Sequence, residues 1–88
     1  MMVGSATGEV YMIGQKGVKF RYRWVLTSSQ LIEVEVVESK SVARKVWGRD
    51  DVSVKDCFAS VFELYAPGTP QLYFSSNKGE WMKLLASK

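Results

Sequence analysis

The chain has 88 residues, a length typical of one domain with a small hydrophobic core. Hydrophobic residues make up 47% and charged residues 24%, which is the balance of a folded globular domain and excludes a disordered chain. The net charge is a modest +3. No apolar run approaches the roughly 20 residues of a membrane-spanning helix, and the first residues lack the basic and apolar regions of a signal peptide.

The residues on which most catalytic and cofactor sites depend are missing. The sequence has no histidine, so it excludes histidine-based triads, acid–base catalysis and metal sites. The single cysteine, Cys57, excludes an internal disulfide and a thiolate zinc site, and it favours a reducing compartment. Glycine-rich phosphate-binding loops are absent as well. We therefore expect a binding module without catalytic residues, metal or cofactor.

The basic residues are concentrated in two segments that contain no acidic residue. Residues 16–23 and 39–49 together carry eight positive charges, whereas the rest of the chain has four basic and nine acidic residues. If the two segments meet in space, one side of the molecule is strongly positive. The alternative is that they form two solvated loops lying apart.

The first half of the chain predicts a hairpin and a third strand. Residues 9–14 form a strand-like run that ends at a glycine-containing turn over 14–17. Residues 20–27 then alternate with a period of two, which is typical of a strand. Tyr22, Trp24 and Leu26 share the side expected to face the core, and Arg21 and Arg23 the other side.

In the third predicted strand, over residues 31–38, aliphatic residues alternate with glutamates. We expect Glu33 and Glu35 on the outer face beside Arg21 and Arg23, where each opposite-charge pair contributes about 0.2–1 kcal/mol. The other face carries the aliphatic residues Ile32, Val34 and Val36. A paired-carboxylate acid–base site at the two glutamates is the alternative, but an exposed strand offers it no partner chemistry.

The second half of the chain predicts four more strands. A basic connection over 39–44 leads into a short strand around 45–47, and Asp50 and Asp51 belong to the turn that follows rather than to a metal site. The further strands are expected at 52–58, 61–65 and 72–74, with a strong turn at 67–70 before the last of them.

The C-terminal residues change to a helical period. Asn77 is a suitable N-cap, and Glu80 three residues later resembles a capping box. Trp81, Leu84 and Leu85 form one apolar stripe, and we expect Trp81 to pack near Trp24 or Phe62. The chain is thus predicted to be mainly β, a seven-stranded antiparallel bent sheet or partly open barrel closed by one C-terminal helix. The domain is expected over 8–87, after a tail of residues 1–7.

Three stretches, in this order, resemble a pleckstrin homology (PH) domain. Residues 23–27 followed by 30–31 resemble the second strand and the start of the third, residues 62–64 resemble a later Phe-x-Leu strand, and Trp81 with Leu84 and Leu85 resembles the hallmark of the C-terminal helix. The resemblance implies that the two basic segments lie at the same open end of a barrel. The implied anion-binding site consists of Lys16, Lys19, Arg21, Arg23, Lys40, Arg44 and Lys45.

The resemblance also departs from the phosphoinositide-binding pattern of the family. Tyr22 and Met12 stand where that pattern has an arginine and a lysine, so the usual inner pocket lacks its cations. Arg21 and Arg23 are one residue out of phase and point to the opposite face of the strand. They suit an outer site on the first hairpin, which some PH domains use for anionic headgroups.

Two binding functions follow from this resemblance, since a fold does not decide a function. One is weak contact with anionic phospholipid, including phosphoinositide, and the other is contact with a protein partner. Both describe a cytoplasmic adaptor or targeting module, peripheral at a membrane or cytoskeletal structure, and the sequence leaves homo-oligomer formation open. The alternative is a small-barrel nucleic-acid-binding domain, because Phe20, Tyr22 and Trp24 alternate with arginines as in a stacking strand.

Overall fold

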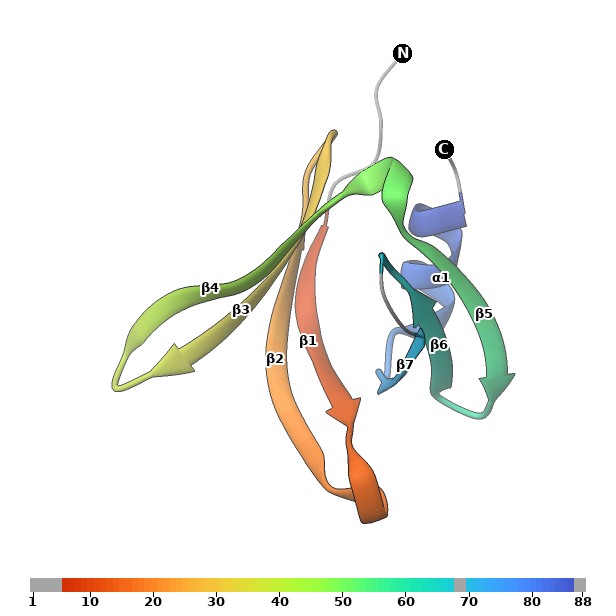
Figure 1. Cartoon of the computed structure of the whole chain (residues 1–88), viewed down its shortest axis with the longest axis horizontal. Helices are drawn as coiled ribbons and strands as arrows, with labels where there is room; N and C mark the ends of the chain where they lie inside the picture. Colours follow the sequence, from red (N-terminus) through yellow and green to blue (C-terminus); the bar gives the residue numbers. More distant parts are fainter. Residues whose placement is uncertain (1–5, 68–69, 87–88) are drawn as a thin grey trace.

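One antiparallel sheet holds all the strands in the part of the chain that the structure describes (Figure 1). The structure is a computed structural model, and it describes residues 6–67 and 70–86. The strands are β1 (Ala6–Ile13), β2 (Lys19–Leu26), β3 (Gln30–Val37), β4 (Lys40–Gly48), β5 (Ser53–Phe58), β6 (Val61–Tyr65) and β7 (Pro70–Phe74), and the helix is α1 (Lys78–Ala86). Short 3₁₀ turns occupy Gln15–Gly17 and Arg49–Asp51. Part of the predicted turn over 67–70 lies outside the described residues.

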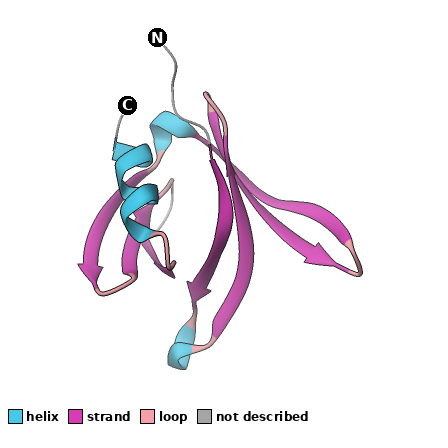
Figure 2. Cartoon of the chain, turned by 180° about the vertical axis from the view of Figure 1, so that it is seen from behind, coloured by secondary structure: helices cyan, strands magenta, loops and turns pink. Residues whose placement is uncertain are grey.

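The sheet is bent, and it remains open. Its strand order is β4-β3-β2-β1-β7-β6-β5, so β4 and β5 are its two edges. Figure 1 shows β1–β4 on one side of the molecule and β5–β7 on the other. Figure 2, the view from behind, shows α1 beside β5–β7 and the β3–β4 hairpin projecting in the opposite direction. The predicted seven-stranded sheet with a C-terminal helix is confirmed.

An aromatic cluster around Trp24 fills the space between the two sides. Trp24 is fully buried, and its ring centroid lies 4.7 Å from that of Tyr73, 5.3 Å from Trp81 and 5.8 Å from Phe62. Trp81 is 2% exposed, so its predicted packing against Trp24 is confirmed. The Trp81 ring also packs closely against β1 at Gly8. A Cβ at this position would lie only 3.2 Å from Cζ2 of Trp81, so the glycine makes room for the ring.

The side-chain alternation of β3 is the reverse of the prediction. The turn between β2 and β3 pairs Leu26 with Leu31, and this register places Glu33 directly across from Trp24. Cross-strand partners share a face, so Glu33 points into the core and is 1% exposed. The aliphatic residues Ile32 and Val34 lie on the outer face instead. The expected pairing of Glu33 and Glu35 with Arg21 and Arg23 is therefore wrong.

The predicted basic connection over 39–44 is also wrong, because β4 starts at Lys40. The chain reverses through Glu38 and Ser39, whose φ angles of 51° and 66° lie in the left-handed region. Such angles at both central positions are those of a two-residue hairpin turn, which usually contains Asn or Gly. The β3–β4 register shifts between Glu33 and Val34, which leaves Arg44 as an extra residue on β4. The two strands thus form a long hairpin with a bulge near its middle.

The described residues begin and end in regular secondary structure. β1 starts at Ala6, two residues before the predicted domain boundary at residue 8, and α1 ends at Ala86. Within the described residues, no helix is long and apolar enough to cross a membrane.

Candidate anion-binding surface

The β1–β2 hairpin carries the first group of predicted site residues. Its turn needs left-handed backbone at Lys16 and Gly17, with φ angles of 59° and 76°. The β1–β2 register sets Lys19 across from Ile13 and Arg21 across from Tyr11, and it also pairs Arg23 with Glu9. Lys19, Arg21 and Arg23 alternate along β2, so all three lie on one face, which is the outer face of the sheet.

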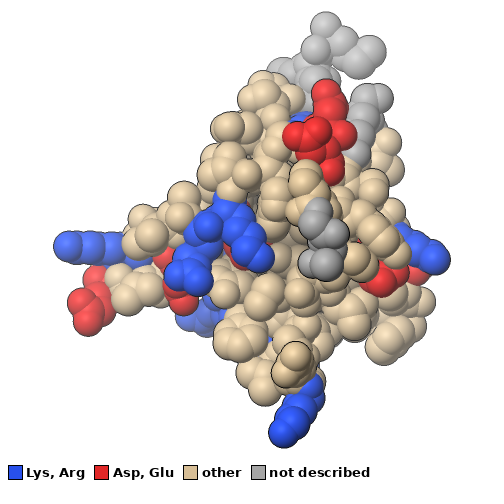
Figure 3. All heavy atoms as spheres, viewed as in Figure 1, with Lys and Arg blue, Asp and Glu red and all other residues tan. Residues whose placement is uncertain are grey.

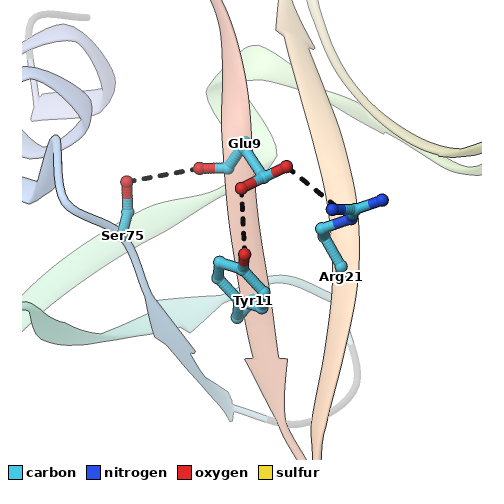
Figure 4. A network of polar contacts seen from close by, with 4 residues as sticks. All are labelled: Glu9, Tyr11, Arg21 and Ser75. Atoms are coloured by element: carbon cyan, nitrogen blue, oxygen red, sulfur yellow. Dashed lines mark hydrogen bonds and ion pairs between the residues drawn. The ribbon is translucent and has the colours of Figure 1, made fainter.

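A carboxylate on the neighbouring strand already contacts this cationic row (Figure 4). Glu9 Oε2 lies 3.6 Å from Nε of Arg21, and Tyr11 donates its hydroxyl hydrogen bond to Glu9 Oε1 at 3.0 Å. Ser75, just after β7, donates to the main-chain carbonyl of Glu9 at 3.5 Å. Because Arg21 and Glu9 are both well exposed, their ion pair is weak. Any anion that bound Arg21 would therefore compete with Glu9.

A depression of about 210 Å³ lies beside the two arginines. Its lining residues come from β1, β2 and β3, namely Glu9, Arg21, Tyr22, Arg23, Val34 and Val36. It sits where β2 and β3 stop pairing, since Arg23 and Val34 are the last partners of that register. The lining of the depression thus combines the guanidinium groups of Arg21 and Arg23 with aliphatic side chains of β3.

The tip of the same hairpin exposes apolar side chains between its cations. Val18 is 51% and Phe20 44% exposed, and Lys16 and Lys19 are exposed beside them. Lys19 Nζ also lies 5.1 Å from the ring centroid of Phe74. We call residues 16–23 the basic hairpin.

The second group of predicted site residues lies on the other face of the sheet. Lys40 is paired with Val37, and Lys45 with the inward-pointing Glu33. Lys45 Nζ is 5.8 Å from the Trp47 ring centroid, and Arg44 makes a 3.4 Å ion pair with Glu35. These contacts direct Lys40, Arg44 and Lys45 away from the outer face that carries Arg21 and Arg23. The seven predicted residues therefore form two groups rather than one patch.

Figure 3 agrees with this division. Lys and Arg side chains lie over the projecting β3–β4 hairpin and, separately, at the tip of the β1–β2 hairpin. Acidic side chains lie close to the basic ones on the projecting hairpin.

Arg49, the last cation of the second basic segment, has a structural role. It is 3% exposed, and its guanidinium donates to the carbonyl of Thr27 at 2.7 Å and to that of Leu84 at 3.0 Å. It thereby joins the β2–β3 turn to the last turn of α1, where a cation is favoured. One of the eight charges in the two segments is therefore not available at the surface.

The core contains a polar cluster that the sequence reading missed. Glu33 Oε1 accepts hydrogen bonds from the indole N–H of Trp24, at 3.1 Å, and from the hydroxyl of Tyr73. Burial and, next, the hydrogen bond to Glu33 raise the pKa of Tyr73 far above its ordinary value. Burial followed by the charge of Glu33 also raises the pKa of Tyr22. Because Glu33 is enclosed by these donors and Glu35 pairs with Arg44, the two carboxylates do not form a shared acid–base site.

Cys57 lies at the other edge of the sheet. It is an exposed, free thiol on β5, at the point where the β5–β6 register shifts.

Comparison with known proteins places this geometry in a fold family. No protein-family model and no curated protein sequence matches the chain. The DH/PH fragment of human ARHGEF11, in a ternary complex with RhoA and its inhibitor, superposes with a TM-score of 0.79 at 15% identity over 92% of this chain. The Slm1-PH domain bound to inositol-4-phosphate superposes with a TM-score of 0.75 at 15% identity over 91% of the chain. The chain has a PH-like fold.

The structural matches cover nearly the whole length of the chain. A structure from a systematic screen for protein–lipid interactions in Saccharomyces cerevisiae matches over 100% of both chains, with a TM-score of 0.70 and 15% identity. The chain covers 90% of Slm1-PH but only 27% of the DH/PH chain in the RhoA complex. At these identities the likeness concerns the fold.

Two positions of the PH pattern can now be located. Met12 and Tyr22 are half-buried and pack against the core, as expected for the inward faces of β1 and β2. The inner side of the first hairpin thus presents a thioether and a phenol, whereas its outer side presents the arginines.

Proposed function

We propose that this chain is a non-catalytic PH-like binding and targeting module whose basic hairpin contacts anionic phospholipid at a cytoplasmic membrane surface. The observation that carries the proposal is the joint exposure of Val18 and Phe20 at a hairpin tip that also exposes Lys16 and Lys19. Exposed apolar side chains next to cations suit the boundary between headgroups and acyl chains.

The basic hairpin has enough charge for weak membrane contact. Each cation near an anionic surface contributes about 1 kcal/mol. Lys16, Lys19, Arg21 and Arg23 therefore supply about 4 kcal/mol, which corresponds to roughly millimolar affinity. Glu9 opposes part of this attraction. The module needs a second contact, from a protein partner or the rest of a larger protein, for stable recruitment.

Two similar structures support an anionic ligand. Slm1-PH structures contain inositol-4-phosphate in one case and phosphoserine in another, and both ligands carry a phosphate group. The nucleic-acid alternative is less well supported, because Trp24 is fully buried and Tyr22 half-buried, so that only Phe20 of the three aromatic residues is exposed. Base stacking needs exposed ring faces.

Vesicle co-sedimentation tests the proposal with two variants of equal net charge. Lys16→Glu/Lys19→Glu should lose binding to vesicles containing phosphatidylserine or phosphoinositide, whereas Lys40→Glu/Lys45→Glu should keep most of it. Wild-type binding should fall steeply with salt, because the charges involved are exposed. Val18→Ser/Phe20→Ser should weaken binding without removing its salt dependence. If the wild type does not sediment at low salt, or if both charge variants behave alike, the lipid proposal is wrong.

Removing the charge of Glu9 should strengthen binding to anionic membranes. Glu9→Gln frees Arg21 and removes one negative charge from the surface, so we expect about fivefold tighter binding to anionic vesicles, since about 1 kcal/mol is gained per charge. Glu63→Gln is the matched control, because Tyr65 donates to Glu63 at 2.9 Å in the same i, i+2 arrangement as Tyr11 and Glu9. Equal affinity of the two variants would contradict the proposed role of the outer face.

A further inference from the structure

The β3–β4 hairpin presents an edge strand that the fold leaves uncovered. β4 is nine residues long and pairs only with β3 within the described chain. Residues 40–46 are all exposed, and we call this segment the free edge. At the opposite edge of the sheet, β5 has six residues and α1 packs against it. Figure 1 shows the β3–β4 hairpin extending away from the rest of the molecule.

An edge strand offers unpaired N–H and C=O groups to any extended chain that fits. Proteins limit such pairing with lysines and bulges, and the free edge contains both, with its bulge at Arg44. The lysines and the bulge disfavour pairing with a second copy of the same strand. Lys40, Arg44 and Lys45 are the only charged residues of β4, so a second copy of β4 would bring six like charges together.

The two faces of the free edge differ in charge. Lys40, Lys45 and, through its ion pair with Glu35, Arg44 lie on the inner face. Ser41, Ala43 and Val46 are paired with outward-facing residues of β3 and lie on the outer face. Val42, which is 50% exposed, is paired with Glu35 and lies among the cations of the inner face. Val46 is 52% exposed. Successive side chains of an added strand point to alternate faces, so the fitting strand has carboxylates on one side and aliphatic residues on the other.

We propose that the free edge of β4 binds an extended segment of a partner protein in which acidic and aliphatic residues alternate, by adding it as a further strand of the sheet. Main-chain hydrogen bonds supply the affinity, and the cations of the free edge supply the selection for acidic residues. This site is separate from the basic hairpin, and it does not depend on lipid binding. It provides a second contact of the kind that weak membrane affinity requires.

A synthetic peptide of alternating glutamate and valine, eight residues long with blocked ends, tests the proposal on the whole chain. We expect it to bind and to slow amide hydrogen exchange in residues 40–46 by at least tenfold, as newly paired main-chain N–H groups should. A peptide of alternating lysine and valine should not bind. The glutamate–valine peptide N-methylated throughout keeps its charges but cannot donate hydrogen bonds, so it should also fail.

Two charge variants separate this proposal from that of lipid contact. Lys40→Glu/Lys45→Glu should lose binding to the glutamate–valine peptide, and Lys16→Glu/Lys19→Glu should keep this binding. The two variants are expected to behave in the reverse way with vesicles. Binding of the N-methylated peptide as tightly as its parent would overturn the strand-addition proposal. So would protection of residues 40–46 caused by dimerisation of the chain alone, or the absence of peptide binding at low salt.

Discussion

At the scale of single residues, the least expected feature is a carboxylate in the middle of an aromatic core. Glu33 is 1% exposed, and it is held by the indole N–H of Trp24 and the hydroxyl of Tyr73. A buried polar group is tolerated when its hydrogen bonds are made, and it is costly when one is removed. The three side chains come from β3, β2 and β7, so they also fix how distant parts of the sheet are packed together.

Tyr73→Phe tests this cluster and its pH dependence. The variant removes one donor to buried Glu33, so we expect a loss of about 1–3 kcal/mol at neutral pH. The pKa of Tyr73 is raised above its ordinary value of 10.0 in the folded state. Above pH 10, the unfolded chain therefore releases a proton that the folded chain retains, and the stability of the wild type falls as the pH rises.

The measurement is urea unfolding of both proteins at neutral pH and above pH 10. The other tyrosines are common to both proteins, so the difference between them reports Tyr73. The stability gap should narrow at high pH, because the variant has no phenol to ionise at this position. A gap that is constant or grows would show that the raised pKa does not contribute.

At the scale of elements, the predictable and unpredictable parts have different physical origins. The strand expected at 61–65 and the apolar stripe of the C-terminal helix were found where they were predicted, since both are bounded by turn-forming residues or by a change of period. The inward face of β3 was predicted wrongly. One side of the strand carries aliphatic residues, whereas the side that faces the core carries Leu31 together with two glutamates. The Leu26–Leu31 pairing decides which side of β3 faces the core, and it is set by the geometry of the turn, which the alternation within β3 does not contain.

The start of β4 was missed for a related reason. A reversal through Glu38 and Ser39 lacks the Asn-Gly or Asp-Gly signature of a two-residue turn. The predicted site was affected by the same error, because it placed the cations of β4 in one patch with those of β2. The basic residues and the outward direction of Arg21 and Arg23 could be read from the sequence, but the separation of Lys40, Arg44 and Lys45 depends on the pairing of β3 with β4.

The same turn gives an element-scale prediction. Left-handed backbone is unfavourable for residues other than Gly, Asn and Asp, and both Glu38 and Ser39 adopt it. Glu38→Asn/Ser39→Gly should therefore stabilise the protein by about 1 kcal/mol, measured by thermal or urea unfolding. Ser28→Asn/Ser29→Gly is the control in the neighbouring turn, where neither residue has a positive φ. A gain in the control and none in the test variant would contradict the reasoning.

At the scale of the whole molecule, an open sheet must be joined to its helix by something other than strand pairing. Arg49 does this by bonding to carbonyls of Thr27 and Leu84, which lie 22 and 35 residues away along the chain. Hydrogen bonds with a charged partner contribute about 1.5–3 kcal/mol each. The position of α1 thus depends on one buried guanidinium as well as on Trp81.

Arg49→Met should release the end of the helix. We expect a loss of at least about 1.5 kcal/mol of unfolding free energy and faster amide hydrogen exchange in α1 than in β1 and β2. Arg44→Met is a suitable comparison, because its ion pair with Glu35 is partly exposed to solvent and should contribute less than about 1 kcal/mol. Uniform acceleration of exchange across all elements would instead mean that Arg49 contributes only to global stability.

The solitary thiol on β5 gives the molecule a ready attachment point for a spectroscopic reporter. Cys57 is the only cysteine of the chain, and it is exposed at the edge of the sheet opposite to β4. A spin label or fluorophore coupled there needs no engineered mutation and occupies neither proposed binding surface. Its depth and tumbling on vesicles would report how the domain is oriented when the basic hairpin meets the bilayer, and whether a strand added at the far edge changes that orientation.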